Sequence, residues 1–202
     1  MKKLLSTLLI SSAVFGGAQA VMAQDIVGAG DADIAVNGTL GADNTDPGST
    51  IPETDVDWIN VTVPTDTIFY NKVSEPTIKA PTYDIINHSG RPVKVSVNNF
   101  ADAAGTTNPT LPNDFALNLK VTGNNVTTTS TKLIEQGVLQ ASTNELITLA
   151  NNVDQYTKND TAVTAGTAVN NHATFTYAGS AKAVAPLKLG YTLSLKFDSI
   201  AF

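Results

Sequence analysis

The chain has 202 residues, of which 12 are basic and 18 acidic, giving a formal net charge of −6 at pH 7. It contains no cysteine, which excludes disulfides, thiol catalysis and zinc sites built on cysteine. The acidic balance argues against nucleic acid as a partner and against binding to anionic polymers through bulk charge.

The N-terminus has the layout of a secretory signal peptide. Lys2 and Lys3 precede an uncharged run over residues 4–18, and small residues follow up to Ala20 and Ala23. The apolar run is short and rich in Ser and Gly, which does not suit a membrane-spanning helix. We therefore predict a signal peptide over residues 1–23, cleaved after Ala23, with cleavage after Ala20 as the alternative. The exported chain is then expected to have no membrane span.

Residues 24–56 form an acidic lead-in that is interrupted by glycine and proline. Within it Ile34, Val36 and Leu40 fall on even positions, and this period of two predicts a short strand over residues 34–40. Residues 41–56 are predicted to be a flexible linker or a long loop.

From Trp58 onward, apolar and polar residues alternate in short runs separated by polar turns. This alternation predicts strands over 58–63, 68–70, 81–87, 92–100, 115–121, 173–177 and 187–197. Residues 88–91 read as a tight turn that joins the strands on either side into a β-hairpin. Residues 132–153 contain apolar positions that fit either a helix or a strand.

About eight strands without a sustained amphipathic helix indicate an all-β fold. We predict an antiparallel β-sandwich of the Ig-like or Greek-key kind over residues 57–202, with a barrel as the less favoured arrangement. A chain of this length buries enough surface to be stable without disulfides.

The sequence offers little that points to catalysis. Its two histidines, His88 and His172, lie in a turn and just before a strand, and no nucleophile-elbow motif is present. The carboxylates outside the lead-in are scattered, unlike the pair that glycoside hydrolysis needs. We therefore predict that the protein is not an enzyme and has no catalytic residues.

We also predict no cofactor and no resident metal. Calcium is the alternative, because Asp31, Asp33, Asp43 and Asp46 offer carboxylate oxygens in predicted loops, although their spacing does not follow the EF-hand order.

The segments DWINVTVPTDTIFY (57–70) and APTYDIINHSGRPVKVSV (80–97) resemble small secreted surface proteins of Gram-positive bacteria that accompany the WxL class of wall-binding proteins. The W-x-L tripeptide itself is missing, since Ile59 and Asn60 follow Trp58. The resemblance implies a β-domain at a Gram-positive cell surface and identifies no binding residue.

Taken together, the sequence predicts a secreted, non-enzymatic structural or adhesive protein of the cell surface, cell wall or extracellular matrix. Its specific form would be a fibre subunit that assembles with copies of itself, or with other surface proteins, when the strand at 34–40 joins a neighbouring sheet. Pairing of that strand within its own domain is the alternative. A second function is a carbohydrate-binding module for cell-wall polysaccharide, in which Trp58, Phe69, Tyr70 or Tyr83 would stack on sugars.

Overall fold

The inner faces of two antiparallel sheets form the core of the protein. The computed structural model describes residues 42–182 and 185–202, and these form eleven strands and one 3-10 turn. The elements are η1 (Val56–Trp58), β1 (Val61–Thr62), β2 (Tyr70–Lys72), β3 (Glu75–Lys79), β4 (Tyr83–Asn87), β5 (Val93–Asp102), β6 (Ala116–Thr122), β7 (Ser130–Glu135), β8 (Val138–Leu139), β9 (Glu145–Leu149), β10 (His172–Ser180) and β11 (Tyr191–Ser199).

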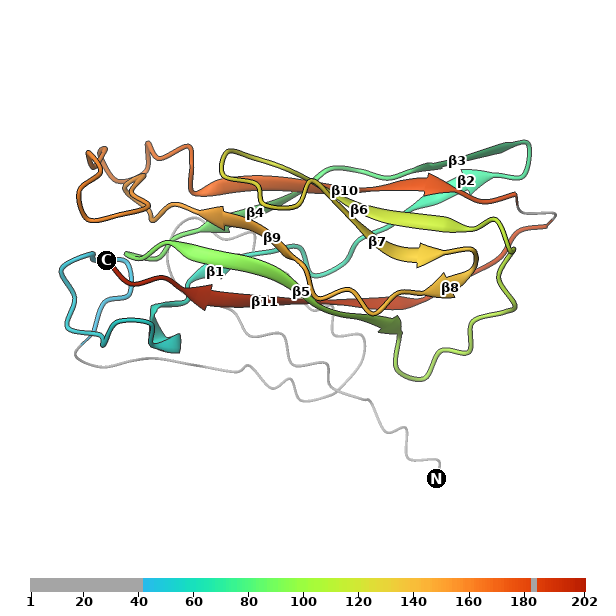
Figure 1. The fold of residues 1–202 in the computed structure, drawn as a ribbon, viewed down its shortest axis with the longest axis horizontal. Coiled ribbons are helices and arrows are strands. Elements are labelled where there is room, and N and C mark those ends of the chain that lie inside the picture. Colours follow the sequence, from blue (N-terminus) through green and yellow to red (C-terminus); the bar gives the residue numbers. More distant parts are fainter. Residues whose placement is uncertain (1–41, 183–184) are drawn as a thin grey trace, which may run out of the picture.

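The larger sheet has the strand order β1-β4-β10-β6-β7-β8, with β3 pairing β10 and β2 pairing β3. The smaller sheet has the order β11-β5-β9. The chain passes repeatedly between the two sheets, so β10 lies between β4 and β6 and β5 lies between β11 and β9, as Greek-key connections require (Figure 1). This confirms the predicted all-β antiparallel sandwich.

The alternating pattern of the sequence explains the core. In β5 the side chains of Val93, Val95 and Val97 are buried, while Lys94 and Ser96 between them are partly exposed. Successive side chains of a strand point to opposite faces, so this alternation places one face of β5 against the larger sheet. β6 and β9 contribute their buried residues to the same cluster.

The predicted hairpin at residues 88–91 is wrong. β4 and β5 lie in different sheets: β4 pairs with β1 and β10, and β5 pairs with β11 and β9. The connection is held by buried polar groups, because Asn87 Nδ2 donates to the carbonyls of Arg91 (2.9 Å) and Ala150 (2.8 Å). Alternation shows which face of a strand is buried, but it does not show which strand is its neighbour.

Several predicted strands have different bounds in the structure. The ambiguous stretch at 132–153 contributes to β7, β8 and β9 and contains no helix. The long strand predicted from Leu187 begins only at Tyr191, and the one predicted from Trp58 is reduced to Val61–Thr62 because Trp58 ends a 3-10 turn. The hairpin of β2 and β3 was not predicted.

The described part of the acidic lead-in is a long loop that packs on the sandwich rather than a flexible linker. Ile51 is buried, and the backbone carbonyls of Asn44 and Thr45 accept hydrogen bonds from Gly90 N (2.6 Å) and Asn152 Nδ2 (2.6 Å). The folded unit therefore begins before residue 57. The predicted signal peptide and the predicted strand at 34–40 lie outside the described residues.

Candidate functional site

A half-open cavity of about 660 Å³ lies where the two sheets separate, near the start of β11. Its walls come mainly from two stretches of chain, residues 66–73, which lead into and through β2, and residues 185–193, which lead into β11. We call this cavity the edge groove. It lies at the end of the molecule opposite to the C-terminus (Figure 1).

Aromatic side chains form the floor of the edge groove. The ring of Phe69 lies between three others, with centroids 6.1 Å from Phe115, 6.0 Å from Tyr177 and 6.5 Å from Tyr191. Tyr191 also packs against Phe100 at 5.0 Å. Spacings of this kind are typical of attractive aromatic contacts, so the floor is a packed aromatic surface.

The rim of the groove leaves large apolar side chains in water. Ile68 is 56% exposed, Tyr70 53%, Val73 54% and Leu187 41%. A single exposed apolar residue is ordinary, but these four line one cavity. A contiguous apolar patch of this kind marks an interaction surface on soluble proteins.

β11 borders the groove and is an edge strand. It pairs with β5 along its whole length, and among the described residues no strand pairs with its other side. Its inward residues Leu193, Leu195 and Phe197 contact the core but are only partly buried, in contrast to the fully buried valines of β5. A long edge with unpaired N–H and C=O groups is a template for another strand.

The two tyrosines of the floor are neutral at physiological pH. Burial, together with the nearby carboxylate of Asp102, raises the pKa of Tyr191 to about 12. Burial also raises the pKa of Tyr177, while a hydrogen bond with Thr67 partly opposes the shift. Asp66 and Lys72 are the charged residues among the described residues of the lining, so the surface suits an apolar occupant.

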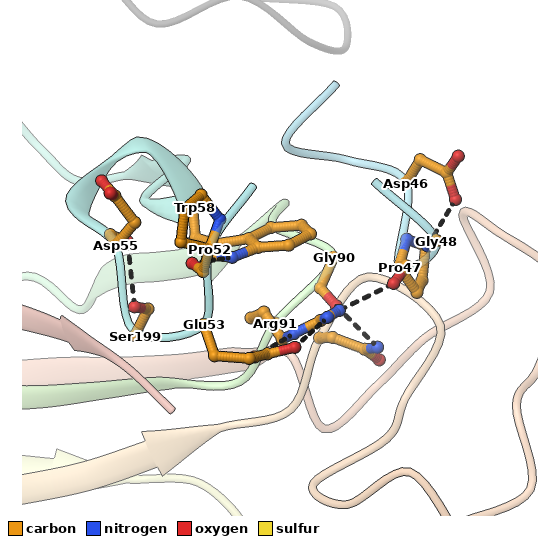
Figure 2. A network of polar contacts seen from close by, with 11 residues as sticks. Asp46, Pro47, Gly48, Pro52, Glu53, Asp55, Trp58, Gly90, Arg91 and Ser199 are labelled. Atoms are coloured by element: carbon orange, nitrogen blue, oxygen red, sulfur yellow. Dashed lines mark hydrogen bonds and ion pairs between the residues drawn. The ribbon is translucent and has the colours of Figure 1, made fainter. Parts of the chain in front are cut away.

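A second cluster, at the other end of the sandwich, holds the lead-in loop in place (Figure 2). The buried guanidinium of Arg91 donates to both carboxylate oxygens of Glu53, at 2.9 and 2.6 Å, and to the carbonyl of Pro47 at 2.8 Å. Its carbon lies 4.2 Å from the centroid of the Trp58 ring and 4.6 Å from that of Phe202. We call these five residues the Arg91 clamp. These contacts join the lead-in loop, the loop after β4 and the C-terminus, so the clamp fixes the lead-in loop to the sandwich.

The Arg91 clamp explains why the side chain of Trp58 is buried. This side chain is fully buried, and its indole N–H donates to the carbonyl of Pro52 at 3.0 Å. It therefore cannot serve as the sugar-stacking platform of a carbohydrate-binding module. Of the other aromatic residues considered for that role, Phe69 lies in the groove floor, and Tyr83 is partly buried against Phe175. Only Tyr70 has a largely exposed ring.

The structure does not bring the two histidines together. His88 Nε2 lies 2.9 Å from Thr62 Oγ1, and His172 Nε2 lies 2.8 Å from Asp84 Oδ1 on the exposed surface. Among the described residues, neither histidine contacts both a nucleophile and an orienting carboxylate. Burial lowers the pKa of His88.

The aspartates considered for calcium close turns instead. Asp43 Oδ1 accepts from the backbone and hydroxyl of Thr45, which lowers the pKa of Asp43, and Asp46 Oδ1 accepts from Gly48 N. Asp31 and Asp33 lie outside the described residues. In the part of the chain that the structure describes, His, Asp and Glu form no group of three that could hold a metal.

Sequence reasoning missed both clusters. The sequence predicts a strand over residues 68–70 and offers Phe69 and Tyr70 as sugar-stacking candidates, but it indicates no groove there and no role for Arg91 beyond a turn. The run Ile68-Phe69-Tyr70 beside exposed polar segments was the one available signal for the groove.

Comparisons with protein families, curated proteins and solved structures give no match for this chain. Over residues 42–182 and 185–202, no helix has the length and apolar character needed to cross a membrane.

Proposed function

We propose that this protein is an exported, non-enzymatic structural or adhesive component of a bacterial cell surface or its matrix, and that it assembles with copies of itself by strand addition. The observation that carries the proposal is an edge of β11 that no strand within residues 42–182 and 185–202 pairs with, next to the apolar edge groove. An added strand would pair its backbone with β11 and place alternate side chains in the groove.

Export and the surface setting rest on the sequence. The layout of residues 1–23 supports secretion, and the resemblance of residues 57–97 supports a place beside WxL-type wall proteins. The absence of cysteine is consistent with a domain whose stability comes from its core.

The two edges of the smaller sheet also support self-association. Isolated domains usually protect a long edge with a bulge, a proline, an inward charge or a covering segment. The opposite edge of the smaller sheet has such a cover, since Thr127 N and Thr128 N donate to Leu146 of β9 and Thr148 N donates to Asn125. β11 has one exposed lysine, Lys196, and a register shift next to Leu195. Unlike β9, β11 has no covering segment among the described residues, and this difference supports β11 as the edge for assembly.

The direct test is the assembly state of the purified chain from Gln24 onward. We expect filaments or large oligomers by negative-stain electron microscopy, and a mass well above the monomer by size exclusion with light scattering. A single monomeric species across the micromolar to millimolar range would overturn the proposal.

A further inference from the structure

We infer that the strand accepted by β11 is the Ile34–Leu40 segment of a second copy of this chain, seated with its apolar side chains in the edge groove. This inference rests on the proposed function and names the donor and the acceptor. It makes the protein a subunit with a donor strand at one end and an acceptor groove at the other.

The chemistry of the segment matches the groove. Residues 34–40 read I-A-V-N-G-T-L, so Ile34, Val36 and Leu40 fall on one face of a strand and Asn37 and Thr39 on the other. Aromatic rings form the floor of the groove, and exposed apolar residues form its rim. A strand with one apolar face can cover such a surface and leave its polar face in water.

The position of the lead-in loop decides between the chain's own segment and that of a neighbour. The Arg91 clamp holds residues 47–58 beside the C-terminal end of β11, where Ser199 Oγ donates to the carbonyl of Asp55 at 3.0 Å. The described chain begins at this end, and the edge groove lies at the other end, around Tyr191 (Figure 1).

The reach of the chain is too short for its own segment to fill the groove. From Ala42 back to Ile34 an extended strand spans about 26 Å, which is also roughly the length of β11. With Ala42 beside Ser199, the chain's own segment would place Ile34 beside Tyr191, Val36 beside Leu193 and Leu40 beside Phe197. It would therefore reach only the near end of the groove and leave Leu40 outside it. A segment from a second copy has no such constraint and can centre on it.

Two basic side chains lie at or near the groove, whose lining also includes the carboxylate of Asp66. The donor segment is preceded by Asp31 and Asp33. Lys72 lines the groove, and Lys188 is exposed in the stretch that leads into β11. Opposite charges beside an apolar contact steer the two partners together and fix their register.

Disulfide trapping tests this inference cleanly because the chain has no cysteine of its own. Two single variants of the mature chain, Val36→Cys and Leu193→Cys, are mixed under mild oxidation and analysed on a non-reducing gel. We expect a mixed disulfide dimer. Thr192→Cys is the matched control, since Thr192 is exposed on the opposite face of β11. It should give roughly tenfold less dimer with Val36→Cys, because a disulfide needs Cα atoms within about 7 Å.

The double variant Val36→Cys/Leu193→Cys separates the two origins of the strand. Disulfide-linked multimers support addition between copies, whereas a disulfide confined to the monomer would overturn it in favour of the chain's own segment. Oligomers that form without the mixed disulfide would overturn the donor and acceptor assigned here while leaving self-assembly in place. A mature chain that remains monomeric in every arm would overturn the proposed function itself.

Deletion of residues 24–41 gives a second readout. This variant keeps the Arg91 clamp, and it should be a folded monomer with the same Trp58 emission as the mature chain. Oligomers that persist after this deletion would overturn the inference. Adding a synthetic peptide of residues 31–41 to the truncated chain should give a one-to-one complex, and a peptide with Val36→Asp should bind at least tenfold more weakly, since a buried unpaired charge is strongly unfavourable.

Discussion

Arg91 lies between the rings of Trp58 and Phe202, with its guanidinium carbon 4.2 and 4.6 Å from their centroids. The three residues come from the loop after β4, the end of the lead-in and the C-terminus. Their contact joins segments that are far apart in the sequence. The clamp therefore makes the lead-in part of the domain and fixes where the chain before residue 42 leaves it.

Replacing Arg91 should destabilise the protein markedly. Arg91→Leu removes two hydrogen bonds to Glu53 and one to Pro47, and we expect a loss of about 2–4 kcal/mol of unfolding free energy. Urea unfolding followed by tryptophan fluorescence measures it, because Trp58 is the only tryptophan. Glu53→Gln should cost no more than about 1 kcal/mol, since the side chain of Glu53 is 44% exposed. Equal losses for the two variants would contradict this account of the clamp.

Acid should weaken the clamp. Hydrogen bonding to Arg91 holds the pKa of Glu53 below its usual 4.5. A carboxyl whose pKa is lower in the folded state adds stability above its unfolded pKa and loses it as pH falls through the folded value. The stability advantage of the wild type over Glu53→Gln should therefore shrink below about pH 4.5. Unfolding curves at pH 3, 4, 5 and 7 test this, and an advantage that grows on acidification would refute it. Comparison with Glu53→Gln cancels the similar shifts at Asp43 and Asp160.

The two tyrosines in the groove floor should respond oppositely to loss of their hydroxyls. Tyr177 Oη shares a hydrogen bond of 2.9 Å with Thr67 Oγ1, so Tyr177→Phe should cost about 1 kcal/mol. Tyr191 Oη is buried without a hydrogen-bond partner in the described part of the chain. Tyr191→Phe should be neutral or stabilising by up to about 1 kcal/mol, because it removes an unsatisfied polar group. Thermal melts of the monomeric 24–41 deletion variant provide the measurement, and a larger loss for Tyr191→Phe would be inconsistent with this geometry.

Gly90 should not tolerate a side chain. A Cβ there would lie 2.8 Å from the carbonyl carbon of Asp46 and from the nitrogen of Pro47, so the lead-in loop would have to move. We expect Gly90→Ala to lower the unfolding free energy by about 1–3 kcal/mol and to speed proteolysis within residues 42–56. Gly48→Ala is the control, because its Cβ would meet only the side chain of Asp46, at 3.3 Å. Similar proteolysis rates for both variants would contradict the close packing of the loop on Gly90.

Some of these features could be read from local sequence. Alternation in Val93–Val97 and in Leu117–Val121 predicts both the strand and its buried face, because side chains alternate across a strand whatever its partners are. The groove could not be found this way. Phe69 is one of three apolar residues in a short run, and its importance comes from Phe115, Tyr177 and Tyr191, which lie far from it in the chain.

The sequence by itself determined that the chain is all-β, that it forms one sandwich and which faces of its main strands are buried, since these depend on patterns a few residues long. Only the tertiary structure decided that β4 and β5 belong to different sheets and that Trp58 is buried rather than exposed. It also decided that, among the described residues, one edge of β11 has no partner strand and lies beside an apolar groove. Those outcomes depend on contacts between distant segments, such as Asn87 with Ala150 and Arg91 with Glu53. A pattern a few residues long does not show which distant segments will meet.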